Sequence, residues 1–262
     1  MSNGHKTIKL KKKRHIAWLT LNRPHKLNAI NSFMLLKLSE TLDNIEKDGD
    51  IRCIIIMGDG EKAFSTGADL TEIRKLTPET ATEFSGKGQQ VFSKLEKISK
   101  PIVAAISGYA LGGGFELALA CDFRIASECA VLGCPEIRLG FIPAWGGTQR
   151  LPRIVGTTKA KRLIMLGERI QAFEALKMGL VDKVVPLEKL ETEAEALAKR
   201  LCEYSPAALK YAKRALYSEN RSLFESGLKR EREFFALLFS TKSIITKIQD
   251  LGSQRKKKEG DC

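Results

Sequence analysis

The chain has 262 residues, a hydrophobic share of 43% and a charged share of 29%, which are ordinary values for a globular protein of one large or two small domains. No apolar run approaches the roughly 20 residues that span a membrane, and the N-terminus lacks the apolar segment of a secretory signal, so a cytoplasmic location is expected. The net charge of +13 favours an anionic partner, such as nucleic acid or a phosphorylated ligand.

The histidines and cysteines narrow the possible chemistry. His5, His15 and His25 all lie near the N-terminus, and the six cysteines include no Cys-x-x-Cys pair. This distribution argues against a histidine triad, a metal site and a disulfide framework.

Short apolar runs alternate with helical patterns over the first half of the chain. Residues 7–13 and 16–21 predict a hairpin that turns near Arg14. Other expected strands cover residues 53–57, 101–106, 123–126 and 130–132. Expected helices begin at Asn31-Ser32, near Pro78 and after Gly114. Recurring strand, turn and helix units of this kind predict a layered α/β core.

The second half of the chain is mostly helical in its pattern. Expected helices cover residues 160–166, 173–178, 187–202, 206–217, 221–239 and 244–251, with one last strand over 180–185. The helix over 221–239 carries more large apolar side chains than a small helical hairpin would hide, which indicates contact with another subunit. We therefore expect a core with the active site over residues 1–200 and a helical oligomerisation region over residues 201–262.

A glycine-rich turn organises the centre of the chain. Three consecutive glycines, Gly112 to Gly114, precede a helical pattern whose first turn contains Glu116. The unpaired N–H groups at such a helix start, and the positive end of the helix dipole, suit a developing negative charge on oxygen. The alternative is a close helix–strand crossing that needs small residues, with Glu116 a plain first-turn acid.

Two further stretches extend the oxyanion hypothesis. Glu136 follows Pro135 and precedes a second glycine-rich turn over residues 140–150, so a second carboxylate is available for acid–base chemistry beside a carbonyl group. Ala68 follows Gly67 after an expected strand and could offer a second N–H to the same oxyanion. A simple strand-to-helix turn is the alternative reading of that stretch.

Five stretches together resemble the crotonase, or enoyl-CoA hydratase, superfamily over about residues 8–239. They are Leu21-Asn-Arg-Pro24, Phe64-Ser-Thr-Gly-Ala-Asp-Leu70, Gly108-Tyr-Ala-Leu-Gly-Gly-Gly-Phe-Glu116, Pro135-Glu136 and Gly146-Gly-Thr-Gln-Arg-Leu-Pro152. The resemblance implies a crotonase-like α/β spiral of ββα units with a C-terminal helical trimerisation region, and a homotrimer or a homohexamer built as a dimer of trimers. It also implies acyl-CoA thioester substrates and no separate cofactor, since coenzyme A is part of the substrate.

The same resemblance implies roles for individual residues. Glu116 is expected to activate water and Glu136 to protonate Cα, while Ala68 and Gly113 donate the N–H groups of an oxyanion hole. The expected substrate and coenzyme A contacts are Ala68, Asp69, Leu70, Thr71, Gly112, Gly113, Ala144 and Trp145. Because hydratases of the superfamily carry both glutamates, the resemblance favours hydration or dehydration of a short-chain substrate of the crotonyl-CoA, 3-hydroxybutyryl-CoA or 3-hydroxypropionyl-CoA type.

Other functions stay open on the sequence alone. Double-bond isomerisation, thioester hydrolysis and hydration of methylglutaconyl-CoA are further reactions of the same superfamily. An RNA-binding role is physically compatible with the net charge of +13. No recognition module is visible, however, so nucleic acid is not the expected partner.

Two stretches depart from the superfamily pattern. Pro143-Ala-Trp-Gly-Gly147 places Trp145 where a small residue is usual, so the indole either shortens the acyl pocket or points away and packs under the turn. Residues 240–247 lack the acidic residues and the glycine expected there. This second departure weakens the expectation that one subunit contacts the coenzyme A of its neighbour.

Overall fold

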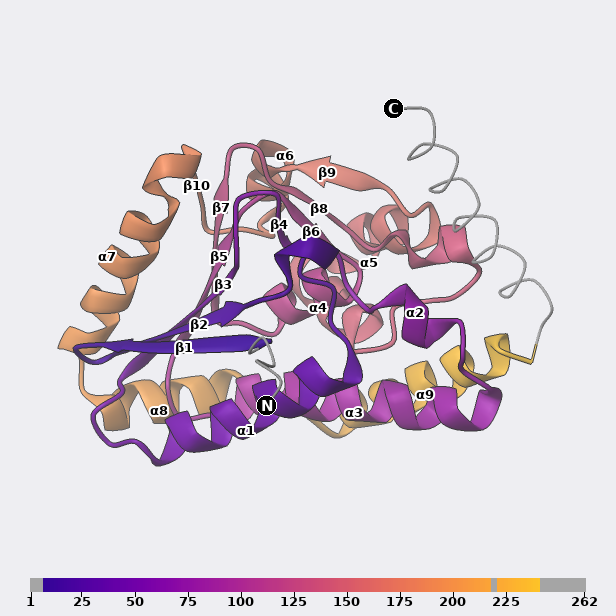
Figure 1. The fold of residues 1–262 in the computed structure, drawn as a ribbon, viewed down its shortest axis with the longest axis horizontal. Helices are drawn as coiled ribbons and strands as arrows, with labels where there is room; N and C mark the ends of the chain where they lie inside the picture. Colours follow the sequence, from indigo (N-terminus) through magenta and orange to yellow (C-terminus); the bar gives the residue numbers. More distant parts are fainter. Residues whose placement is uncertain (1–6, 218–220, 241–262) are drawn as a thin grey trace, which may run out of the picture.

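The computed structural model describes residues 7–217 and 221–240, and its strands form two sheets (Figure 1). One sheet has six strands in the order β1 (Ile8–Lys13), β2 (Ile16–Leu21), β3 (Cys53–Gly58), β5 (Ile102–Ile106), β7 (Phe123–Ser127) and β10 (Lys183–Val185). The other has four strands in the order β4 (Ala63–Ser65), β6 (Tyr109–Leu111), β8 (Val131–Gly133) and β9 (Arg169–Gln171).

Helices surround the two sheets. They are α1 (Ser32–Lys47), α2 (Leu70–Ile73), α3 (Pro78–Lys97), α4 (Gly113–Leu119), α5 (Gly147–Met165), α6 (Ala172–Met178), α7 (Leu190–Glu203), α8 (Pro206–Leu216) and α9 (Arg221–Leu238), with short 3-10 turns η1 (Pro24–Lys26), η2 (Pro135–Leu139) and η3 (Leu187–Lys189). Local signals set their starts: the Asn31 side chain accepts a hydrogen bond from the Met34 N–H at 2.9 Å, and Thr77 caps α3 just before Pro78.

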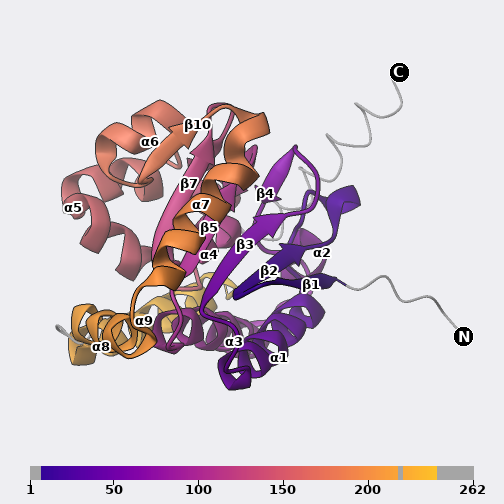
Figure 2. The same ribbon diagram turned by 90° about the vertical axis from the view of Figure 1, so that its left-hand side faces the viewer.

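The six-stranded sheet explains why its central strands are apolar throughout. Strands β2, β3, β5, β7 and β10 run parallel, and α7 covers one of their faces (Figure 2). In β3, Cys53 and Ile55 pack toward α7, whereas Ile54 and Ile56 belong to the main core on the opposite face. A strand that is buried on both faces needs apolar residues at every position.

The predicted N-terminal hairpin is confirmed. Strands β1 and β2 pair antiparallel, and Arg14 makes the turn with φ of 53°. Some lysines of β1 face acidic side chains: the Lys9 Nζ atom lies 3.0 Å from an Asp59 carboxylate oxygen, and the Lys12 Nζ atom lies 2.8 Å from one of Asp48. Part of the basic run is therefore neutralised within the chain.

The second sheet and α5 differ from the sequence prediction. Strands β4, β6 and β9 have three residues each, which is too short for a periodic pattern to register. The helix expected over 160–166 is the end of the longer α5, which is broken where Gly156 leaves the helical region with φ of 77°. The helix expected over 244–251 lies outside the described residues.

Helix α9 lies along α3 rather than forming a separate hairpin with α8 (Figure 1). This packing buries Phe235 and Phe239, so part of the apolar surface expected to meet another subunit is covered within the chain itself. Three other side chains of α9 remain open, with exposed fractions of 61% for Leu223, 55% for Phe234 and 63% for Leu237.

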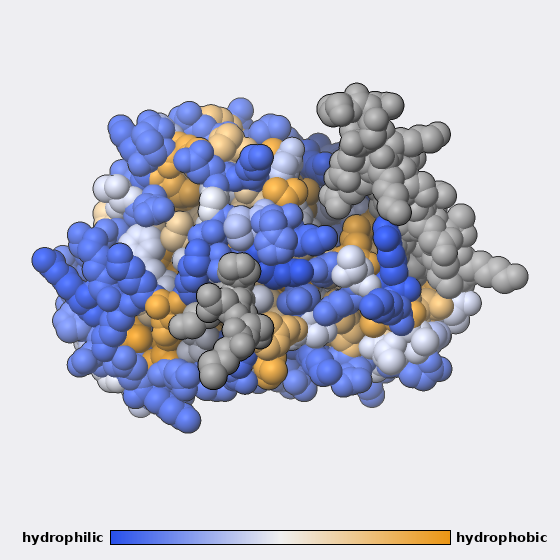
Figure 3. All heavy atoms as spheres, in the orientation of Figure 1, coloured by the Kyte–Doolittle hydropathy of each residue, from blue (hydrophilic) through white to orange (hydrophobic). Residues whose placement is uncertain are grey.

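The visible surface is mostly hydrophilic with separate hydrophobic patches between the polar residues (Figure 3). In the part of the chain that the structure describes, no helix is both long enough and apolar enough to cross a membrane.

Candidate active site

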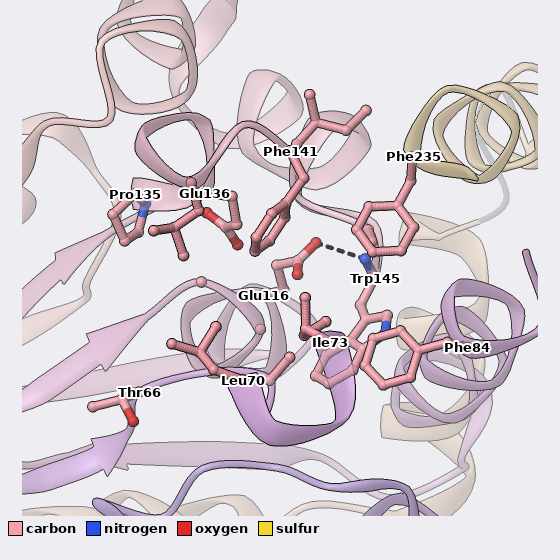
Figure 4. A pocket seen from close by; sticks show the side chains of 16 residues that line it. Thr66, Leu70, Ile73, Phe84, Glu116, Pro135, Glu136, Phe141, Trp145 and Phe235 are labelled. Atoms are coloured by element: carbon pink, nitrogen blue, oxygen red, sulfur yellow. Dashed lines mark hydrogen bonds between the residues drawn. The ribbon is translucent and has the colours of Figure 1, made fainter. Parts of the chain in front are cut away.

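A small, mostly apolar cavity of about 70 Å³ lies between the first turn of α4, the turn before α5, and α3 (Figure 4). Most of the residues predicted from the sequence to form the site line it: Ala68, Leu70, Gly112, Gly113, Glu116, Glu136, Ala144 and Trp145. Stretches far apart in the chain thus meet at one place, which sequence spacing alone does not establish.

Asp69 and Thr71 are the two predicted residues that do not line this cavity. The Asp69 carboxylate caps α2, where it accepts hydrogen bonds from the Thr71 N–H at 3.0 Å and the Thr71 hydroxyl at 2.8 Å. It also lies 2.8 Å from the Arg23 guanidinium. Burial opposes ionisation, but these bonds lower the pKa of Asp69 overall. Asp69 is thus engaged in shaping the turn, and its contact with coenzyme A stays a prediction.

The N–H groups of Ala68 and Gly113 border the same space. Neither donates to another group among residues 7–217 and 221–240. A Cβ built onto Gly113 would lie 3.4 Å from the Ala68 nitrogen, so the two N–H groups are near neighbours. Gly67 and Gly112 precede them with φ of 93° and 51°, a backbone region that glycine adopts at little cost. The arrangement can stabilise a negative oxygen.

Glu116 lies in the first turn of α4 and is almost fully buried. Its Oε1 atom accepts hydrogen bonds from the Trp145 N–H at 2.8 Å and the Gly147 N–H at 2.7 Å. A Cβ on Gly147 would lie 2.9 Å from that oxygen, so only glycine lets the turn approach the carboxylate this closely. The two N–H donors favour the ionised form of Glu116.

Glu136 comes from η2 and faces the cavity from another side (Figure 4). Its Oε2 atom is buried and has no hydrogen-bond partner in the described part of the chain. Burial raises the pKa of Glu136 to about 8, against the opposing effect of its own backbone N–H. A carboxyl group with this pKa is mostly protonated at neutral pH and can therefore act as a proton donor.

The pKa of Glu116 is also raised, first by burial and then by the nearby charges of Glu136 and Glu231, while the bonds from Gly147 and Trp145 oppose the shift. Because Glu116 has two N–H donors from the turn, whereas Glu136 has its own backbone N–H and no partner at Oε2 in the described residues, we place the charge of the pair on Glu116 and the proton on Glu136. One carboxylate and one carboxylic acid in the same cavity form a base and an acid.

Glu231 of α9 is a third buried carboxylate that the sequence interpretation missed. Its exposed fraction is 2%, and it accepts hydrogen bonds from the Gly146 and Thr148 N–H groups at 2.7 and 3.0 Å. A signal did exist in the sequence. Leu228, Glu231 and Phe235 recur at helical spacing on one face of α9, which places the glutamate on the buried side.

Trp145 is fully buried, and its indole both lines the cavity and packs beneath the turn. Its ring centroid lies 5.3 Å from that of Phe84 and 5.4 Å from that of Phe92, both on α3. A Cβ on Gly113 or Gly88 would overlap the indole ring. The sequence left open whether the indole shortens the acyl pocket or packs under the turn, and in the structure it lines the cavity and packs under the turn at once.

Other aromatic walls of the cavity were not predicted. Phe84, Phe141 and Phe235 come from α3, the turn before α5, and α9, and Figure 4 shows them around the carboxyl groups. The rings of Phe141 and Phe235 meet edge to face with centroids 5.9 Å apart. Each residue reads as an ordinary core position in the sequence, so only the tertiary structure reveals its place. No group of three metal-ligating side chains occurs among the described residues.

The parallel sheets, the paired N–H groups and the facing glutamates define a protein of the crotonase fold. The chain belongs to the enoyl-CoA hydratase/isomerase family, whose model matches residues 11–258. It is 41% identical over 232 residues to a short-chain-enoyl-CoA hydratase of Clostridium acetobutylicum, covering 88% of this chain and 89% of the relative. It is also 40% identical over 238 residues to a crotonyl-CoA hydratase of Syntrophomonas wolfei, covering 91% and 92% of the two chains.

Solved structures show the same likeness. An enoyl-CoA hydratase from Bacillus anthracis matches with a TM-score of 0.80 and 37% identity, covering 95% of this chain and 97% of that one. An enoyl-CoA hydratase/isomerase from Xanthobacter autotrophicus matches with a TM-score of 0.87 and 31% identity, covering 93% and 92%.

The position of the indole can be tested with two glycines of α3. Gly88→Ala should lower the free energy of unfolding by about 1–3 kcal/mol, because the added methyl group overlaps the Trp145 ring. Gly86→Ala is the matched control: its methyl group would lie 3.2 Å from the end of the flexible Arg232 side chain, so the better helix propensity of alanine should leave it neutral or stabilised. Equal effects in thermal or urea unfolding would contradict this placement of Trp145.

Proposed function

We propose that this chain is an enoyl-CoA hydratase that reversibly adds water across the 2,3 double bond of short-chain acyl-CoA thioesters. The observation that carries the proposal is the meeting of Glu116 and Glu136 in one cavity with the free N–H groups of Ala68 and Gly113. The short-chain-enoyl-CoA hydratase and crotonyl-CoA hydratase relatives support it.

In the proposed reaction the thioester oxygen accepts hydrogen bonds from the Ala68 and Gly113 N–H groups. These donors stabilise the negative charge that develops on that oxygen as the enolate forms. Ionised Glu116 takes a proton from water while the water oxygen bonds to Cβ. Protonated Glu136 then gives its proton to Cα, so that one water molecule is added in total and the pair is left with one proton, as it began.

The preference for a short acyl group is supported by the cavity walls. Phe84, Phe141, Trp145 and Phe235 form bulky walls of the cavity, whose volume of about 70 Å³ favours a short acyl group. The relatives named for short-chain and crotonyl substrates agree with this size.

Assembly and location complete the proposal. Exposed apolar side chains on α6, α8 and α9, including Phe173, Leu216, Phe234 and Leu237, support a homotrimer or homohexamer. Sedimentation at micromolar concentration should give a species of three or six chains, and a monomer there would contradict the assembly. A cytoplasmic location stays a prediction.

Both glutamates should be essential for hydration. Glu116→Gln and Glu136→Gln should each lower kcat for crotonyl-CoA by roughly 100-fold or more, because each removes one proton-transfer group. The loss of the enoyl-thioester absorbance measures the reaction. The exposed Glu128 supplies the control, since Glu128→Gln should leave kcat unchanged. A parent-like kcat in either active-site variant would mean that the residue has another role.

The pH dependence separates the two roles. Glu136 acts in its protonated form, which is populated below its pKa of about 8, so kcat should fall as the pH rises through that value. A rate that instead rises through pH 8 would assign Glu136 to the base.

Trp145 should set the length of the acyl chain that the site accepts. Trp145→Leu should raise kcat/KM for 2-hexenoyl-CoA relative to crotonyl-CoA by roughly tenfold. The two additional methylene groups of the hexenoyl chain can then occupy the space that the indole fills in the parent. The ratio of the two kcat/KM values is the measurement, so a general loss of stability does not affect it. An unchanged ratio would show that another wall limits the chain.

A further inference from the structure

The turn after Pro143, taken together with the first two residues of α5, has its N–H groups divided between two buried carboxylates. Trp145 and Gly147 donate to Glu116, whereas the alternate residues Gly146 and Thr148 donate to Glu231. All four nitrogen-to-oxygen distances lie between 2.7 and 3.0 Å. Successive N–H groups thus point to opposite sides, and Glu116 and Glu231 hold the turn between α4 and α9.

Glu231 is fully engaged as an acceptor. Its Oε1 atom accepts from the Gly146 N–H and from the Gln89 side chain at 3.1 Å, and its Oε2 atom accepts from the Thr148 N–H and the Thr148 hydroxyl. Burial raises the pKa of Glu231, while these four donors oppose the shift. A glutamine at this position offers only one acceptor oxygen, so its NH₂ group would face two donors and two of the four hydrogen bonds would be lost.

The carbonyl groups of the turn are also held. The Ser85 hydroxyl donates to the Ala144 carbonyl at 2.7 Å, and the Arg150 guanidinium donates to the Trp145 carbonyl at 2.8 Å. Arg150 is fixed in turn by Glu96, at 2.6 Å. Because each peptide group is planar, these carbonyl bonds and the two glutamates together set the direction of the N–H groups of the turn.

We propose that Glu231 is a positioning residue, which holds the turn so that the Trp145 and Gly147 N–H groups keep Glu116 in place and ionised. The inference rests on the proposed hydratase function, because it assigns Glu231 a part in that reaction. Glu231 does not line the cavity and therefore acts through Glu116.

The charge of Glu231 should also be visible in the pH profile. The titratable groups on which the charge of Glu231 acts are Glu116, Glu136 and the buried thiol of Cys134, while Arg150 holds the same turn and Arg232 is the next residue of α9. Glu136 takes no hydrogen bond from the turn, so it senses Glu231 mainly as a nearby negative charge that raises its pKa. Removing that charge should lower the pKa of Glu136 and move the fall in kcat to a lower pH.

The test compares Glu231→Gln with Glu233→Gln, the same substitution at an exposed position of α9. Glu231→Gln should lower kcat for crotonyl-CoA by roughly 10-fold or more with KM within about threefold, because a displaced base slows chemistry more than binding. The double variant Glu116→Gln, Glu231→Gln should have a kcat less than about threefold below that of Glu116→Gln alone. A residue that acts by positioning the Glu116 carboxylate has no effect once that carboxylate is absent. Additive losses, or a kcat like that of the control, would overturn the inference.

Amide hydrogen exchange of residues 142–150 provides a measurement that does not depend on activity. Exchange in this segment should be at least roughly tenfold faster in Glu231→Gln than in the parent and in Glu233→Gln, with little change elsewhere. Unchanged exchange would overturn the inference. A parent that fails to hydrate crotonyl-CoA would instead contradict the proposed function, and the exchange result would still decide whether Glu231 holds the turn.

A milder variant covers the case in which Glu231→Gln does not fold. Thr148→Val removes the hydroxyl, which donates to Glu231 and accepts a hydrogen bond from the Gln149 side chain, and keeps the shape of the side chain. It should lower kcat and speed exchange of the turn in the same direction, by roughly threefold each. A parent-like result in both measurements would count against the inference as strongly as the result with Glu231→Gln.

Discussion

The burial of three carboxyl groups around one turn is the constraint that governs this site. An ionised carboxylate away from water is strongly unfavourable unless hydrogen bonds compensate it, and like charges nearby increase the cost. Glu116 and Glu231 meet this requirement with N–H and O–H donors from the turn and from Gln89. No described residue donates a hydrogen bond to Glu136 Oε2, so a bound proton compensates the burial of this carboxyl group instead. The acid and the base of the proposed reaction thus differ because their hydrogen-bond donors differ.

The fold meets this constraint through close approach of backbone to carboxylate. Gly112 and Gly147 stand where a Cβ would lie 2.8 Å from a Glu136 oxygen and 2.9 Å from a Glu116 oxygen. Helix α3 contacts several parts of the site, since Ser85 bonds to Ala144, Gln89 bonds to Glu231, and the ring of Phe84 packs against Trp145. The same rigid helix that packs the core therefore also sets the shape of the cavity.

Local features of the site could be predicted from the sequence, whereas contacts across the fold could not. The consecutive glycines before α4 and Glu116 in its first turn lie within a few residues of one another, so their combined role can be recognised in the sequence. The spacing of Glu231 from Leu228 and Phe235 places it on the apolar face of α9, although Arg230 and Arg232 flank it in the sequence. That this face lies along α3 and beside the turn before α5 is not encoded by any local pattern. The three-residue strands are also set by their neighbours rather than by their own residues.

The position of Glu231 has a consequence for how the chain matures during synthesis. The hydrogen bond between Gln89 and Glu231 joins residues 142 positions apart, and that between Gly146 and Glu231 joins residues 85 positions apart. Such contacts of high sequence separation form late, after the loop-closure entropy has been overcome. A nascent chain that has released α4 and η2 from the ribosome already carries both cavity glutamates, yet α9 has still to be made. Catalytic competence would then arise only after α9 has been made and has packed against α3.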